Sequence, residues 1–89
     1  QELQEIAAHF YMSRSYLSRI FRKVTGFSVV EYLNFVRVRK AQELLKGSRM
    51  RITEISESTG FGNITYFERV FRSLSGQSPA QYRRGEVQK

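Results

Sequence analysis

Residues 16–26 read YLSRIFRKVTG, and residues 66–76 repeat the pattern as YFERVFRSLSG. The repeat keeps the aromatic, arginine and glycine positions, so that Tyr16, Arg19, Phe21, Arg22 and Gly26 return unchanged fifty positions later. Apolar residues in each copy are spaced i, i+3, i+4, i+7, which is typical of one face of a helix. We therefore predict two amphipathic helices whose inward residues are Leu17, Ile20, Phe21 and Val24 in the first, and Phe67, Val70, Phe71 and Leu74 in the second.

A shorter helical pattern precedes each copy. Leu3, Ile6 and Phe10 have helical spacing before the first copy, and residues 52–59 repeat that spacing before the second. Tyr11 and Met12 are expected to form the first turn, with Ser13 capping the helix that follows. Residues 60–62 (GFG) form the second turn, with Asn63 as the cap. Two short helices joined by a tight turn, the second strongly amphipathic, indicate a helix-turn-helix motif.

Between the two motifs, residues 28–47 predict one long helix. Ser28 and Glu31 form a capping box at its start, and Gly47 ends it. Its apolar residues are Tyr32, Leu33, Val36, Ala41, Leu44 and Leu45. After the second copy, Ser78 and Pro79 are expected to begin one last short helix, because proline is tolerated at the first helical position.

The fold class expected from these patterns is all-α. Residues 1–27 form a first helix-turn-helix subdomain, residues 28–47 a linker helix, and residues 48–89 a second helix-turn-helix subdomain. A chain of 89 residues suits one compact domain or two very small ones that share a core. Because the chain opens on Gln1 and not on Met, we expect it to be part of a larger protein.

The charge balance points to a polyanionic partner. Fifteen Lys and Arg residues oppose eight acidic ones, for a net charge of +7, which favours nucleic acid first and an anionic membrane surface second. The plainer alternative is a soluble domain that is simply basic. No apolar run approaches the roughly 18 residues of a spanning helix, and no signal peptide is evident, so we expect no membrane partner.

The residue types argue against catalysis. The chain has no Cys and no Asp, and its single histidine, His9, has no companion ligand. No nucleophile, general base or metal set can be assembled from the remaining side chains. We therefore expect no enzymatic activity, no metal and no cofactor.

The candidate functional residues lie opposite the apolar stripes. In a major groove, arginine can bind guanine, short hydroxyls can meet several bases, glutamate can accept from cytosine, and an apolar group can touch the thymine methyl. The predicted base-reading residues are Ser15, Ser18, Arg19, Ile64, Thr65, Glu68 and Arg69. The predicted phosphate contacts, which fix register without reading sequence, are Arg14, Arg22, Lys23, Asn63 and Arg72.

Each assignment has a structural alternative. Arg19 and Arg69 could pack by their stems and pair with Glu54 or Glu57. Ile64 could simply cover the edge of the core, and Glu68 could restrain a neighbouring arginine. The remaining basic residues could form an ordinary solvated face, and the tyrosines and phenylalanines lie at core spacing, where packing is a stronger interpretation than stacking on bases.

Three segments resemble the DNA-binding domain of the AraC/XylS family of bacterial transcription regulators. These are residues 55–61 (ISESTGF), residues 66–72 (YFERVFR) and residues 76–83 (GQSPAQYR), and together they are similar to the C-terminal signature of the family. The first half agrees through residues 6–8 (IAA), Met12, Ser13 and residues 16–22 (YLSRIFR). The resemblance covers essentially the whole chain.

The resemblance implies two homeodomain-like helix-turn-helix subdomains joined by a linker helix, with the two recognition helices in successive major grooves of double-stranded DNA. It also implies a cytoplasmic, nucleoid-associated regulator, expected to be an activator that recruits or positions RNA polymerase. The family usually has one more helix before the first motif, and small residues where Phe10 and Tyr11 stand here. A small-molecule effector or a dimer partner would act only through a domain that is absent from this chain. The functional alternative from another class is a basic helical module that binds an acidic protein.

Overall fold

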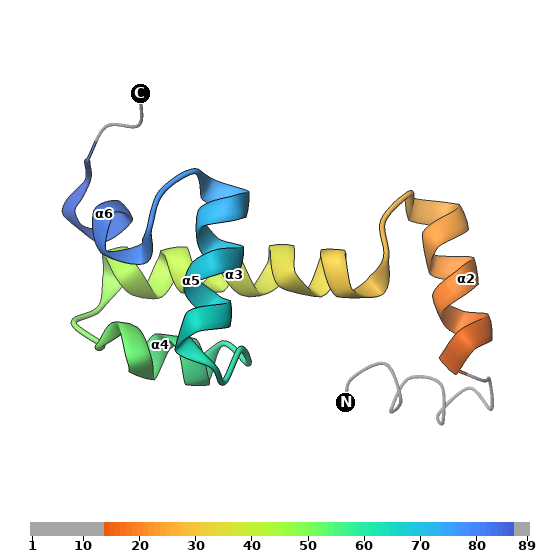
Figure 1. Ribbon diagram of the computed structural model, residues 1–89, viewed down its shortest axis with the longest axis horizontal. Coiled ribbons are helices and arrows are strands. Elements are labelled where there is room, and N and C mark those ends of the chain that lie inside the picture. Colours follow the sequence, from red (N-terminus) through yellow and green to blue (C-terminus); the bar gives the residue numbers. More distant parts are fainter. Residues whose placement is uncertain (1–13, 87–89) are drawn as a thin grey trace. The chain divides into compact units, whose positions relative to one another are not determined.

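The computed structural model describes residues 14–86, and all of its regular elements in that range are helices (Figure 1). They are α2 (Arg14–Thr25), α3 (Val29–Gly47), α4 (Ile52–Ser58), α5 (Ile64–Ser75) and α6 (Pro79–Arg84). The predicted all-α fold class is confirmed. The helix expected at residues 3–10 and the cap expected at Ser13 lie outside the described residues.

The chain divides into two compact units, Gln1–Leu33 and Asn34–Lys89, and the boundary between them lies within α3. Most of the helix expected as a linker over residues 28–47 therefore packs with the second unit. The start of that helix agrees with the prediction, because the Ser28 amide donates to Glu31 Oε1 at 2.8 Å and the Glu31 amide donates to Ser28 Oγ at 3.0 Å. The hydrogen bond from the Ser28 backbone lowers the pKa of Glu31, with smaller contributions from the Ser28 hydroxyl and the charge of Arg22.

In the first unit, α2 ends at a glycine turn. Gly26 has φ +82°, and its amide donates to the Arg22 carbonyl at 2.8 Å, which is typical of a helix C-terminus. The Phe21 ring meets the Tyr32 ring edge to face, with 5.5 Å between the centroids. This contact joins α2 to the first turns of α3.

The core of the second unit is built from three helices and one turn. Its buried apolar residues are Val38, Ala41 and Leu45 of α3, Ile55 of α4, Phe61 of the turn, and Phe67 and Phe71 of α5. Four ring contacts, with centroids 5.1 to 5.8 Å apart, run in a chain from Tyr66 through Phe61, Phe67 and Phe71 to Tyr82 of α6. These contacts fix α5 against α6 and the turn that precedes α5.

The turn between α4 and α5 has the glycine geometry expected of a helix-turn-helix motif. Gly60 and Gly62 have φ of +93° and +75°, which residues with side chains rarely adopt. The amides of Phe61 and Gly62 both donate to the Ser56 carbonyl, at 3.0 and 3.2 Å. These bonds reverse the chain and place Phe61 in the core.

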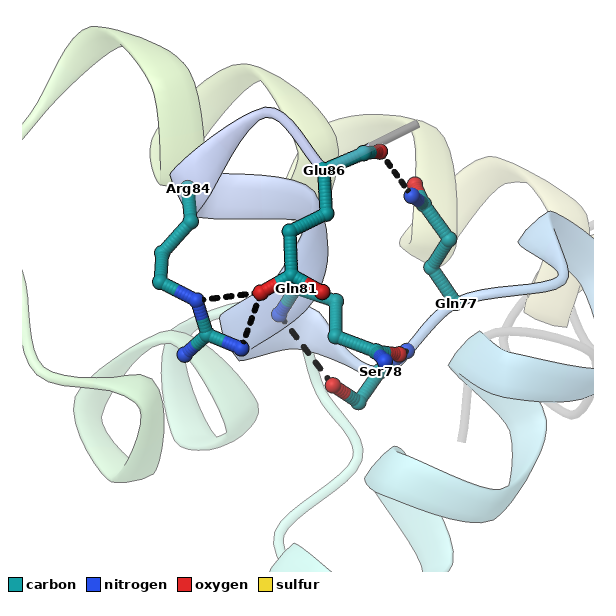
Figure 2. Close-up of polar contacts among 5 residues, drawn as sticks. All are labelled: Gln77, Ser78, Gln81, Arg84 and Glu86. Atoms are coloured by element: carbon teal, nitrogen blue, oxygen red, sulfur yellow. Dashed lines mark hydrogen bonds and ion pairs between the residues drawn. The ribbon is translucent and has the colours of Figure 1, made fainter. Parts of the chain in front are cut away.

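The last helix, α6, is capped as predicted. Ser78 Oγ accepts from the Gln81 amide at 3.1 Å, and Pro79 occupies the first helical position (Figure 2). Figure 2 also shows Arg84 paired with the Glu86 carboxylate and Gln77 donating to the Glu86 carbonyl, so the residues after α6 fold back on its start.

The inward stripes are narrower than predicted on α2 and α5. In α5 the buried side follows Ile64, Phe67, Phe71 and Ser75, and Leu74 lies at its edge with 49% of its surface exposed. Its counterpart Val24 is 78% exposed, and Ile20 is exposed as well. The predicted inward orientation of Ile20, Val24 and Leu74 is therefore wrong. All three residues keep the i, i+3, i+4, i+7 spacing, so this spacing shows which side of a helix is apolar but not how far around the helix the packing reaches.

Aromatic spacing also overstated burial on α2, on α3 and in the turn between them. Tyr16, Tyr32, Phe27 and Phe35 were predicted at core spacing but are exposed, and so is Val36. The buried residues of α3 are Val38, Ala41 and Leu45, and Val38 lies two positions from Val36 and so about 200° around the helix. The apolar residues of α3 are spread over two sides, and the stripe predicted from spacing mixed the two.

Candidate nucleic-acid interface

Helix α5 presents a polar face opposite its buried stripe. Phe67 and Phe71 anchor it to the core, and on the other side Thr65, Glu68, Arg69 and Arg72 are exposed. The predicted base-reading residues of α5 thus share one accessible face with Arg72. The exception is Ile64, which is half-buried and packs against the core, as its structural alternative expected.

The start of α5 is capped by Asn63. Its Oδ1 accepts a hydrogen bond from the Tyr66 amide at 2.9 Å, while the residue itself stays exposed. No acidic residue occupies the first turn of this helix, so the partial positive charge at its N-terminus is not neutralised locally. Free backbone N–H groups and an uncompensated dipole suit this end to a phosphate.

Arg69 is held by an aromatic ring and not by a carboxylate. Its guanidinium carbon lies 5.5 Å from the centre of the Tyr66 ring. Within residues 14–86, the ion pairs are Lys40 with Glu43 and Arg84 with Glu86, and neither involves Arg69. Glu54, one of the carboxylates considered for Arg69, instead accepts from the Arg51 amide at the start of α4, at 2.9 Å.

Helix α2 carries the equivalent residues of the first unit. Ser15, Arg19, Arg22 and Lys23 are exposed and Ser18 is half-buried, whereas the side chain of Arg14 is outside the description. Arg19 and Lys23 line a shallow open hollow together with Tyr16 and Ile20. A basic and polar face is therefore present on both helices of the repeat.

Two residues of α3 reach the second motif and were not predicted to do so. The Asn34 side-chain amide donates to the Tyr66 hydroxyl at 3.0 Å. The Arg37 side chain lies across Gly60, where an added methyl group would stand 3.2 Å from Arg37 Nε. Neither contact has a local sequence signal, since the partners are 32 and 23 positions apart (Tyr66 from Asn34, Gly60 from Arg37).

Comparison with known proteins agrees with this geometry. A family model described as a helix-turn-helix domain matches residues 6–85. The chain is 41% identical over 86 residues to the Msm operon regulatory protein of Streptococcus mutans, and 36% identical over 84 residues to the arabinose operon regulatory protein of Escherichia coli. The chain belongs to the AraC/XylS family.

A solved structure extends the family likeness to three dimensions. The DNA-binding domain of AdpA, a global transcriptional factor crystallised with a target DNA, is 36% identical, with a TM-score of 0.84 over 93% of this chain and 75% of that one. The AraC/XylS resemblance and the helix-turn-helix architecture predicted from the sequence are both confirmed.

The matched regulators are longer than this chain. It is covered to 97% and 94% by the two regulatory proteins, but spans only 31% and 29% of their lengths. The described part of this AraC/XylS domain contains no helix long and apolar enough to cross a membrane. In that same part, no three His, Cys, Asp or Glu side chains come close enough to hold a metal ion.

Proposed function

We propose that this chain is a sequence-specific double-stranded DNA binder within a bacterial transcription regulator that works in the cytoplasm. The observation that carries the proposal is α5, a capped helix fixed by Phe67 and Phe71 that exposes Thr65, Glu68, Arg69 and Arg72 on its free side. A major groove admits one such helix, and arginine binding to guanine is its commonest specific contact.

The roles proposed for individual residues follow from their positions. Arg69, Thr65 and Glu68 read bases, and Arg72 and the exposed start of α5 at Asn63 contact phosphates. Ile64 is half-buried and offers only its outer edge to a thymine methyl.

The same roles are proposed for the first motif. Ser15, Ser18 and Arg19 of α2 read bases, whereas Arg14, Arg22 and Lys23 contact phosphates. The net charge of +7 supports the phosphate contacts proposed for both motifs. Lys and Arg side chains that neutralise phosphates release counterions from DNA, and this release favours binding.

We further propose that the parent regulator activates transcription by recruiting or positioning RNA polymerase. The support is family membership, together with the operon regulators to which the chain is similar. This role is exercised by the whole regulator, whereas DNA binding can be measured on the chain itself.

Selection of bound duplexes from a random pool tests the proposal. We expect two short preferred boxes about ten base pairs apart, one for each motif, and a preference for them of about a thousandfold over scrambled duplexes. A single box would mean that only one helix engages. Equal binding to all duplexes, or tighter binding to an acidic protein, would refute sequence-specific readout.

Two arginine variants separate readout from phosphate contact. Arg69→Ala should lose about 1 to 3 kcal/mol on the selected duplex and relax the preference at one base pair. Arg72→Ala should weaken binding to every duplex and lower the salt slope by about one. If Arg69→Ala loses equal affinity on all duplexes, Arg69 contacts a phosphate and not a base. If Arg72→Ala leaves the salt slope unchanged, Arg72 does not contact the DNA backbone.

A further inference from the structure

Arg69, the arginine proposed to read a base in the second motif, packs on the Tyr66 ring, and Tyr66 is hydrogen-bonded to α3. Arg69 lies over the Tyr66 ring at 5.5 Å, and the Tyr66 hydroxyl accepts from Asn34 Nδ2 of α3 at 3.0 Å. We propose that Asn34 and Tyr66 are positioning residues that set the direction of the Arg69 guanidinium before DNA is bound. The inference rests on the proposed function, because it presumes that Arg69 reads a base.

The Tyr66 side chain is held by two contacts, and its backbone by a third. Its hydroxyl accepts from Asn34, and the ring makes an edge contact with Phe61, with 5.8 Å between the centroids. The backbone amide of Tyr66 donates to the Asn63 cap at 2.9 Å, which holds the start of the helix that carries the ring. A ring held in this way offers the guanidinium a surface of defined direction on which to lie. Pre-organisation of this kind reduces the side-chain entropy that is lost when a long side chain is immobilised on binding.

Asn34 is held at its place by little else in the described part of the chain. Its Oδ1 is buried without a hydrogen-bond partner there, so the contact with Tyr66 is the bond that holds its amide. Burying an amide with only one of its polar atoms hydrogen-bonded costs free energy of folding, and an apolar residue that served packing alone would avoid this cost. A polar residue here is accounted for if the direction of the Tyr66 ring matters to function.

The test compares Tyr66→Phe, Asn34→Ala and the double variant Asn34→Leu/Tyr66→Phe on the 89-residue chain. Tyr66→Phe keeps the ring and the packing but removes the hydroxyl. The double variant removes both polar partners together and so avoids leaving one of them unpaired, which protects folding. Leu44→Ala, on the same helix and packed against the same core, is the matched control for lost stability.

Binding is measured on the selected duplex and on its variants at the base pair that Arg69→Ala identifies. All three variants keep the aromatic ring, so the full value of an exposed cation–π contact sets the upper limit of the effect. We expect each to reduce the preference at that base pair by up to about two- to fivefold, with scrambled duplexes unaffected. In an Arg69→Ala background the same changes should have no further effect on preference, because the pair acts through Arg69. Leu44→Ala should leave the preference unchanged.

The opposing results are distinct. The inference is overturned if the folded variants Tyr66→Phe and Asn34→Leu/Tyr66→Phe keep the wild-type preference at that base pair. An equal loss in the Arg69→Ala background also overturns it. If Arg69→Ala changes no base-pair preference, the inference fails while sequence-specific binding stands, whereas a wild-type chain without any preferred duplex refutes the proposed function itself.

Discussion

Asn63 is expected to serve both the fold and DNA binding, and three substitutions separate the two roles. Asn63→Ala removes the acceptor that receives the Tyr66 amide at 2.9 Å. Loss of such a cap costs about 1 kcal/mol, which lowers the melting temperature of a domain of this size by about 4 to 8 °C. Asn63→Ser keeps a capping oxygen and should remain close to the wild type.

Asn63→Asp has opposite effects on the two roles. It keeps the acceptor and adds a negative charge to a first turn that has no acidic residue, so it should stabilise α5 by about 0.3 to 1 kcal/mol. On DNA the same charge faces phosphates. Repulsion between unit charges about 4 Å apart in water is about 1 kcal/mol, so binding to every duplex should weaken by about fivefold.

Stability is best followed on amide NMR signals of α5 during urea unfolding, because the chain divides into two compact units that need not unfold together. DNA affinity is followed by fluorescence anisotropy on specific and scrambled duplexes. If Asn63→Ala is as stable as the wild type, the cap does not support α5. If Asn63→Asp binds as tightly as the wild type, Asn63 does not face the DNA backbone.

Three further predictions concern the fold. Phe71→Ala should cost about 3 to 5 kcal/mol of unfolding free energy, whereas Leu74→Ala, three positions on and half exposed, should stay within about 0.5 kcal/mol; equal losses in urea titrations would contradict the narrow stripe. Gly60→Ala should cost about 1 to 3 kcal/mol in the same assay because of its φ of +93°, and no loss would show that the turn relaxes. Because the pKa of Glu31 is lowered by folding, its stabilisation of the start of α3 is present at neutral pH and fades as pH falls below the ordinary glutamate range; Glu31→Gln should flatten that dependence in amide exchange.

Local signals predicted the ends of the helices well. The Ser28–Glu31 box, the Asn63 cap and the Ser78–Pro79 start are each formed by residues at most three positions apart, and the structure contains all three. The helices α2 and α5 each end at a glycine, Gly26 and Gly76, in the left-handed conformation that favours glycine.

The side of each helix that is buried was predicted less well, because burial depends on residues that are distant in the sequence. Val36 and Val38 are equally apolar, and only packing against α4 and α5 decides that Val38 is buried. The contact between Asn34 and Tyr66 crosses 32 positions, and neither residue carries a local mark of it. The exposed polar face of α5 was easier to predict than the residues that support it, since that face follows the regular spacing of the helix.

The two copies of the motif agree at positions that pack inward and at the arginine proposed to read a base, but they differ at another proposed base-reading position. Phe21 and Phe71 occupy equivalent positions on the inner side, whereas Ser18 stands where the second copy has Glu68. A hydroxyl meets several bases, but a carboxylate can only accept, and in the major groove it suits the amino group of cytosine. Two helices that share their arginines but differ at this position would prefer different boxes. The proposed operator is therefore not a simple repeat, and the chain would bind it in one direction only.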